Sequence, residues 1–220
     1  MSLFDTTYDV IVIGGGHAGS EAAAASANMG ATTLLITMNL QNIAQMSCNP
    51  AMGGIAKGQI IREIDALGGY SGIVTDKTAI QFKMLNKSKG PAMWSPRAQS
   101  DRMMFAETWR NMLENTKNLD FYQDSVNGLL FDGSKISGVK TVLGLEIKAK
   151  TVIVTAGTFL NGLIHIGEKK QTAGRQGEFA SVELAEYLKS LGIEIGRLKT
   201  GTCARLDGSS IDLSVMEEQG

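Results

Sequence analysis

The chain has 220 residues, 43% of them hydrophobic, and a formal net charge of −1. That length allows a substantial core in one or two domains. The charge excludes a polycation, so any contact with nucleic acid has to use local basic patches. We expect no membrane span and no signal peptide, because the sequence has no long apolar run. Two distant cysteines, Cys48 and Cys203, favour a reducing, cytoplasmic compartment over a disulfide framework.

The start of the chain has a strand–turn–helix pattern. Apolar residues 10–13 predict a buried strand, the glycines of Gly14-x-Gly16-x-x-Gly19 follow at once, and the alanine-rich residues 21–27 predict a helix. In such a pattern the first glycine forms the tight turn, the second lets a pyrophosphate approach the backbone, and the third lets the helix pack on the strand. The flanking strand and helix favour a dinucleotide site over a glycine-rich turn without a ligand.

The turn does not decide which dinucleotide binds. The second predicted strand, residues 32–37, is followed by Met38 and Asn39. NAD sites usually carry a carboxylate there, which binds the ribose hydroxyls. Asn39 is able to hydrogen-bond a ribose, but the usual acidic residue is missing. FAD stays open as a ligand, because its sites use the same turn.

Helical periodicity returns after an irregular segment, residues 39–54. A helix is predicted over residues 55–67, with one apolar face formed by Ile60, Ile61, Ile64 and Leu67. A polar and aromatic region covers residues 70–96. A second amphipathic helix is predicted over residues 97–115, and we expect its methionines in the core. Its apolar positions are Met103, Met104, Phe105, Trp109, Met112 and Leu113.

The second half of the predicted domain begins as a β-meander. Strands are predicted over residues 119–122, 126–131, 136–143 and 146–150, with Asp132-Gly133 as a hairpin turn, and a further buried strand over residues 151–157. This order resembles the flavoprotein fold of the glutathione-reductase type. The fold class is therefore α/β: a Rossmann-like FAD-binding fold with a β-meander crossover and an inserted helical segment.

That fold also implies positions near the cofactor. Its Thr-Ala-Gly turn, here at residues 155–157, passes close to the flavin, and Val126 would place its backbone against the adenine. A closing strand that ends in Gly-Asp is absent after residue 157. We therefore expect residues 1–220 to be the N-terminal part of an FAD-binding domain in a longer protein, without the closing strand, an NADH-binding insertion or a helical C-terminal domain.

Several further motifs carry a more specific resemblance. They are residues 47–58 (SCNPAMGGIAKG), 62–69 (REIDALGG), 85–92 (LNKSKGPA), 97–101 (RAQSD), 157–160 (GTFL), 164–167 (IHIG) and 197–202 (RLKTGT). Together they resemble the MnmG family, also called GidA, over residues 8–214. One departure is visible, because the family usually reads Thr-Gly-Thr-Pro-Pro-Arg where residues 200–205 read TGTCAR.

The resemblance implies an enzyme of tRNA modification. Its members attach a carboxymethylaminomethyl or aminomethyl group to C5 of the wobble uridine. They use FAD reduced by NADH, methylenetetrahydrofolate as carbon donor, and glycine or ammonium. The implied partners are tRNA, a second copy of the chain in a homodimer, and an MnmE-type GTPase that forms a heterotetramer. We expect this chain alone to be inactive, and no metal site is implied.

The resemblance also assigns residues to FAD. The FAD-binding positions of the family match Gly14, Gly15, Gly16, His17, Ala18, Gly19, Val126 and Ser181. The His17 side chain either donates to phosphate or caps the surface, and Ser181 is also a plausible helix-cap serine.

Cys48 is the candidate nucleophile, because chemistry at C5 of uridine commonly begins with a thiolate that adds at C6. A helix N-terminus, or Lys57 nearby in sequence, would favour the thiolate. The alternative is a buried, inert cysteine. Cys203 replaces a family proline, and we do not expect it to be catalytic.

Two groups of basic residues are candidate contacts for tRNA phosphates or other anions. The first group is Lys83, Lys87, Lys89, Arg97 and Arg102, and the second is Arg175, Arg197, Lys199 and Arg205. The alternative for both is a solvated surface.

Two other enzyme classes share part of the pattern. A generic flavin oxidoreductase would need a Cys-x-x-x-x-Cys pair near residue 45, and Cys48 has no partner there. A folate- and FAD-dependent tRNA uridine methyltransferase is closer, but the motifs at residues 48–58 and 89–101 favour the MnmG family.

Overall fold

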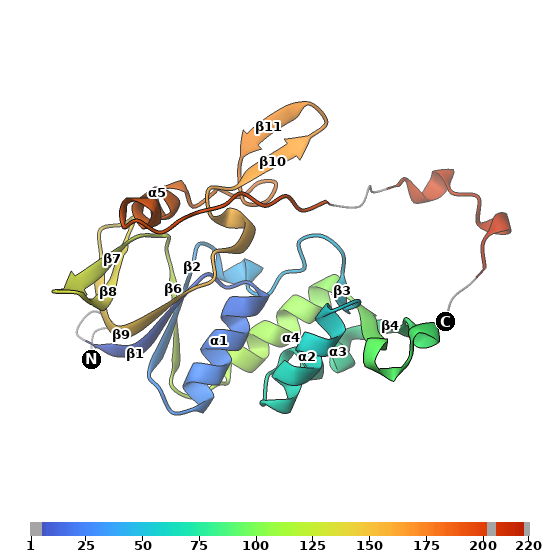
Figure 1. The fold of residues 1–220 in the computed structure, drawn as a ribbon, viewed down its shortest axis with the longest axis horizontal. Helices are drawn as coiled ribbons and strands as arrows, with labels where there is room; N and C mark the ends of the chain where they lie inside the picture. Colours follow the sequence, from blue (N-terminus) through green and yellow to red (C-terminus); the bar gives the residue numbers. More distant parts are fainter. Residues whose placement is uncertain (1–5, 202–205, 218–220) are drawn as a thin grey trace.

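The computed structural model describes residues 6–201 and 206–217. The expectations for Cys203 and Arg205 lie outside these residues. Within them the chain forms a six-stranded sheet, a three-stranded sheet, a two-stranded hairpin and five α-helices (Figure 1).

The main sheet has the strand order β6-β2-β1-β9-β8-β7. The strands are β1 (Tyr8–Ile13), β2 (Thr33–Thr37), β6 (Leu119–Gln123), β7 (Val126–Asp132), β8 (Lys135–Thr141) and β9 (Glu146–Val154). Pairing is parallel from β6 through β2 and β1 to β9, and antiparallel from β9 through β8 to β7. This arrangement confirms the predicted Rossmann-like half joined to a β-meander.

Strand β9 differs from the prediction. Residues 146–150 and 151–157 were predicted as two strands, but one continuous strand, Glu146–Val154, leaves the meander and enters the parallel sheet. Its last residues are not buried, since Ile153 and Val154 are 36% and 39% exposed. Beyond Lys148 this strand pairs only with β1, and no described strand covers its other edge.

Two clusters of buried side chains cover the two faces of the main sheet. On one face Val12 and Leu35 pack with helix α1 (His17–Asn28), helix α3 (Ser71–Thr78) and helix α4 (Arg102–Glu114). On the other face the meander and helix α5 (Val182–Ser190) cover the remaining apolar residues of β1 and β2. Figure 1 shows the resulting layers, with α1 and α4 on one side and α5 on the other.

Helix α4 begins later than predicted. Residues 97–100 belong to strand β5 (Ser95–Ser100), and the Asp101 carboxylate caps the helix by accepting from the backbone N–H groups of Met103 and Met104. Phe105, Trp109 and Leu113 are fully buried, as expected. Met103 and Met104 are 74% and 50% exposed, so the prediction that they lie in the core is wrong.

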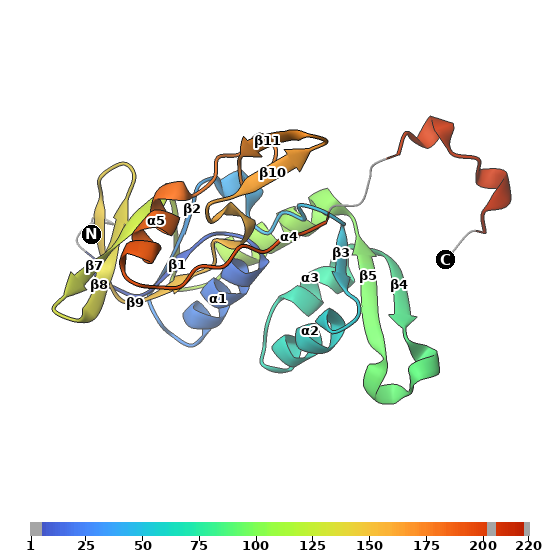
Figure 2. The same ribbon diagram turned by 45° about the horizontal axis from the view of Figure 1, so that its top comes forward.

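The inserted segment is only partly helical. Helix α2 (Lys57–Ala66) and α3 accompany a small sheet with the order β3-β5-β4, where β3 is Ala51–Gly53 and β4 is Ala79–Leu85 (Figure 2). The predicted apolar face of α2 is only partly buried by the described residues, because Ile61 and Ile64 are half-buried. Ile60 is 56% exposed and Leu67 is 90% exposed.

The remaining elements are short. Strands β10 (Leu163–Ile166) and β11 (Lys169–Thr172) form a hairpin that projects from the main sheet. Single 3₁₀ turns are η1 (Leu40–Asn42), η2 (Lys87–Lys89), η3 (Pro91–Met93), η4 (Gly157–Phe159), η5 (Gly208–Ser210) and η6 (Leu213–Val215). None of the helices described is both long and apolar enough to cross a lipid bilayer.

Candidate functional site

The glycine turn between β1 and α1 is packed tightly on the end of β9. Gly14 has φ +102°, and a Cβ there would lie 2.8 Å from the carbonyl oxygen of Thr155. A Cβ on Gly19 would lie 1.8 Å from the carbonyl oxygen of Gly14. Glycine is therefore required at both positions for the tight turn and for the close approach of helix to strand.

Gly16 lies on the open side of the same turn. A Cβ at this exposed residue would meet no atom within 4 Å, and its φ of −73° suits any residue. Gly16 caps α1 without a side-chain hydrogen bond, and the first turn of the helix has no acidic residue. The backbone N–H groups of His17, Ala18 and Gly19 therefore begin the helix without an intrahelical carbonyl partner. Such a helix N-terminus favours an anion.

Thr155 fixes the turn from the neighbouring strand. Its backbone N–H donates to the carbonyl of Ile13 at 2.8 Å, and its Oγ1 lies 2.8 and 2.9 Å from the carbonyl oxygens of Ile13 and Gly14. Sequence reasoning placed the Thr-Ala-Gly turn near the flavin but gave Thr155 no role of its own. The signal was a hydroxyl residue at the end of the strand that pairs with β1.

His17 packs inward and does not cap the surface. Its Nε2 donates to the carbonyl of Ala44 at 3.0 Å, and its ring meets Phe105 edge-on at 5.5 Å between centroids. Burial holds the pKa of His17 below its usual value of 6.5, although the bond to Ala44 and the charge of Glu21 act in the opposite direction. The backbone N–H of Ala44 also donates to Gly15, at 2.7 Å. The loop after β2 is therefore fixed to the glycine turn by two hydrogen bonds.

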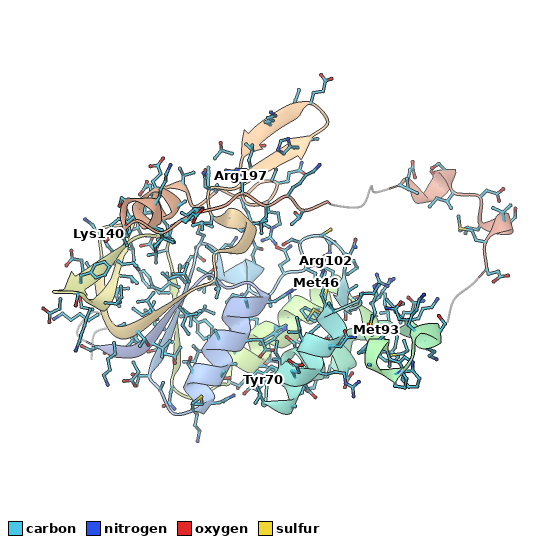
Figure 3. All side chains as sticks on the ribbon, viewed as in Figure 1. Met46, Tyr70, Met93, Arg102, Lys140 and Arg197 are labelled. Atoms are coloured by element: carbon cyan, nitrogen blue, oxygen red, sulfur yellow. The ribbon has the colours of Figure 1, made fainter. Side chains whose placement is uncertain are left out.

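The same loop carries the half-buried Cys48, which two arginines reach from distant parts of the chain. Arg102, at the start of α4, donates to the carbonyl of Cys48 at 2.8 Å. Arg175 donates to Oγ of Ser47 at 2.8 Å. Figure 3 shows Arg102 close to Met46 of this loop. Helix α2 (Lys57–Ala66), the expected source of a favourable dipole, begins only after strand β3. Two guanidinium groups, those of Arg102 and Arg175, contact the loop.

Arg175 is largely occupied by its own neighbours. Its Nε forms a 2.6 Å ion pair with Glu178, and its guanidinium stacks over Phe159 at 5.7 Å from the ring centroid. The two charged side chains are only 17% and 23% exposed. With the bond to Ser47, these contacts join the loop after β2 to the turn after β9. The geometry of Arg175 therefore favours a structural role, in which it connects two segments, over the contact with tRNA phosphate expected from the sequence.

Val126 and Ser181 lie on segments that return to this end of the sheet. Val126 is buried at the start of β7, two residues after Asp124, whose N–H donates to the carbonyl of Thr37 at the end of β2. Ser181 precedes α5, but its side chain makes no capping hydrogen bond. Its backbone N–H instead donates to the carbonyl of Phe159 at 2.8 Å.

The other basic residues lie in separate places. Lys87 and Lys89 are exposed in the connection between β4 and β5, and Arg97 lies within β5. Arg197 donates to the carbonyl of Asn161 at 3.2 Å, beside the base of the β10–β11 hairpin (Figure 3), and Lys199 is exposed two residues later. The described residues contain no cluster of three or more potential metal ligands.

Known proteins share this arrangement. The family model described as Glucose inhibited division protein A matches residues 9–220. Proteins of Flavobacterium johnsoniae and Christiangramia forsetii, each named tRNA uridine 5-carboxymethylaminomethyl modification enzyme MnmG, are 69% identical over 217 residues, 99% of this chain. The match covers only 35% of each relative, so the chain spans about a third of their length.

Solved structures agree with this result. The structure of GidA from Aquifex aeolicus superposes with a TM-score of 0.91 at 51% identity, over 96% of this chain and 35% of that one. A GidA-related protein from Thermus thermophilus shares the fold, with a TM-score of 0.62 at 22% identity over 85% of this chain and 69% of that one. The chain therefore belongs to the glucose inhibited division protein A (GidA) family.

Proposed function

We propose that residues 1–220 form the N-terminal part of the FAD-binding domain of a tRNA-modifying enzyme. The enzyme would add a carboxymethylaminomethyl or aminomethyl group to C5 of the wobble uridine. The observation that carries this proposal is the open, uncapped N-terminus of α1 at Gly16, in a chain 69% identical to proteins named for that modification.

The residues at the glycine turn fit the diphosphate of FAD. Space for an anion exists beside Gly16, and the first backbone N–H groups of α1 are available as donors. In this proposal the residues Gly14, Gly15, Gly16, His17, Ala18 and Gly19 hold the diphosphate. The Val126 backbone binds the adenine, Ser181 is a further contact to FAD, and the turn at residues 155–157 borders the flavin side. When bound, FAD supplies the redox chemistry, with NADH as the reductant.

Cys48 is the proposed nucleophile toward the uridine ring. Its thiolate would add at C6, and the electron pair released toward C5 would form a bond to the methylene carbon of methylenetetrahydrofolate. The bond from that carbon to the folate nitrogen would break and be replaced by a bond to the amine nitrogen. Loss of the C5 proton would then expel the thiolate from C6. Glycine or ammonium would provide the nitrogen. The hydrogen bonds from Arg102 to Cys48 and from Arg175 to Ser47 support this role, because they fix the backbone of the loop that carries the thiol.

The remaining parts of the proposal concern partners. The exposed Lys87, Lys89 and Lys199, together with Arg97 and Arg197, are the proposed contacts to tRNA phosphates. A homodimer, an MnmE-type GTPase partner and a cytoplasmic location complete the function that the family resemblance implies.

Retention of FAD tests the proposal directly. The intact natural chain is mixed with FAD, separated from free FAD by gel filtration, and examined for flavin absorbance. Gly16→Val should abolish retention while leaving the fold intact, since the new side chain meets no protein atom and enters the space meant for phosphate. Gly196→Val is the matched control, because that glycine also has open space around it. A wild-type chain without flavin, or equal retention by both variants, would contradict the proposed site.

A further inference from the structure

The strand that should carry an acidic ribose ligand in a dinucleotide site has none here. Strand β2 ends at Thr37, and the chain continues with Met38 and Asn39. The side-chain oxygen of Asn39 already accepts the backbone N–H of Gln41 at 2.8 Å and so caps the turn η1. The side-chain oxygen of Asn39 is therefore already engaged within the loop, and its neutral amide does not supply the charged acceptor that a carboxylate would.

A carboxylate reaches the same place from the neighbouring strand. Strand β6 lies beside β2 in parallel, and Asp124 directly follows it. The backbone N–H of Asp124 donates to the carbonyl of Thr37 at 3.1 Å. On the same strand Gln123 accepts the N–H of Leu40 at 3.1 Å, which holds the loop after β2 against the end of β6. These bonds place Asp124 at the carboxyl end of β2.

One oxygen of this carboxylate lacks a donor. Oδ1 accepts the backbone N–H of Ser125 at 2.7 Å. Oδ2 is the only carboxylate atom among the buried side-chain atoms of the described residues that have no hydrogen-bond partner. An unpaired buried acceptor is costly, and the cost is highest for a charged group. The residue as a whole is half-buried, so rotation of the side chain about Cα–Cβ would bring Oδ2 to a ribose hydroxyl, and that one donor would complete its hydrogen bonds.

We propose that Asp124 is the ribose ligand of this site and accepts a hydrogen bond from a hydroxyl of the adenosine ribose. This inference rests on the proposed binding of FAD. The carboxylate that β2 lacks is thus provided by β6, one strand further from the glycine turn. Val126, the proposed adenine contact, follows two residues later, so one short segment would bind both the sugar and the base.

The test is a thermodynamic cycle between protein and ligand. The dissociation constants of FAD, and of its analogues that lack the 2′ or the 3′ hydroxyl of the adenosine ribose, are measured on the intact natural chain by flavin fluorescence. Removal of the contacted hydroxyl should weaken binding to the wild type by about tenfold to a hundredfold, the range for a hydrogen bond to a charged group. Asp124→Ala should bind FAD as weakly as the wild type binds that analogue, and should lose little more when the hydroxyl is removed.

Two further variants keep the result interpretable. Asp124→Asn retains an oxygen for the N–H of Ser125, so it serves if the alanine variant fails to fold. Asp132→Ala, at the exposed last residue of β7, should bind FAD and both analogues like the wild type. If removal of either hydroxyl weakened binding by the same factor in the wild type and in the Asp124 variants, the proposed contact would be wrong, although FAD itself would still bind. Failure of the wild type to bind FAD would instead refute the proposed function.

Discussion

Thr155 offers a direct test of how β9 supports the glycine turn. Thr155→Val keeps the shape and the strand preference of the side chain but removes its hydroxyl. The Ile13 carbonyl keeps the backbone N–H of residue 155 as a donor, whereas the Gly14 carbonyl loses the hydroxyl 2.9 Å away. A net hydrogen bond contributes about 0.5–1.5 kcal/mol, and an acceptor left without a donor adds to the cost. We expect the free energy of unfolding to fall by about 1–2 kcal/mol.

Strand β9, which ends directly before Thr155, contains a matched control. Thr151 donates from Oγ1 to the carbonyl of Asp9 at 2.8 Å, also across the β9–β1 pair, but at the exposed end far from the turn. Thr151→Val should cost about 0.5 kcal/mol, since water replaces the lost donor. Its affinity for FAD should match that of the wild type. Thr155→Val should weaken FAD binding by about threefold to tenfold, because the glycine turn proposed to hold the diphosphate loses one of the hydrogen bonds that order it.

Urea unfolding followed by circular dichroism and FAD titration followed by flavin fluorescence give the two quantities for each variant. We expect both variants to lose stability toward urea, but only Thr155→Val to lose affinity for FAD. An unchanged FAD affinity in Thr155→Val, or an equal loss of affinity in both variants, would refute the view that β9 organises the turn.

Three other changes probe the same region. Because the pKa of His17 is lowered in the folded chain, the unfolded chain takes up a proton at a higher pH than the folded chain does. The free energy of unfolding should therefore be highest above about pH 6.5 and fall as the pH drops below it. His17→Gln should flatten this part of a stability–pH profile measured by urea unfolding. Arg175→Met should increase the alkylation rate of Cys48, followed by peptide mass spectrometry, because it frees the loop that carries the thiol; Arg197→Met, which removes a cation without contact to that loop, should leave the rate unchanged. Gly19→Ala should lower the free energy of unfolding by about 1–3 kcal/mol and abolish FAD retention, since the added methyl collides with a backbone carbonyl; a stable, flavin-retaining variant would contradict the described packing.

The glycine turn and the main sheet could be predicted because their signals are local. A run of apolar residues, a fixed glycine spacing and an alanine-rich helix are all complete within residues 10–27. The same local reading went wrong where pairing decided the structure. Residues 97–100 belong to β5 and alternate between half-buried and buried positions. Ala98 pairs with Met52 on one neighbouring strand and with Phe82 on the other, so strand pairing and not the helical spacing of the sequence decided the structure.

Contacts across long sequence distances were equally out of reach. Nothing near Ser47 in the sequence indicates that Arg175, 128 residues away, donates to it. The role proposed for Asp124 depends on β6 lying beside β2, which periodicity does not reveal. Exposed apolar residues such as Leu67 were misread because helical spacing identifies an apolar face but not what covers it.

The attachment of Thr155 to the end of β1 also has a consequence for folding. The two carbonyls that Thr155 contacts belong to residues 141 and 142 positions earlier in the chain. At a translation rate of about 5–20 residues per second, roughly 7–30 seconds separate the synthesis of the two partners. Contacts of such high sequence separation form slowly, because loop closure precedes any gain in interaction energy. The glycine turn, although it is made before Thr155, would therefore reach its final shape among the last parts of the sheet.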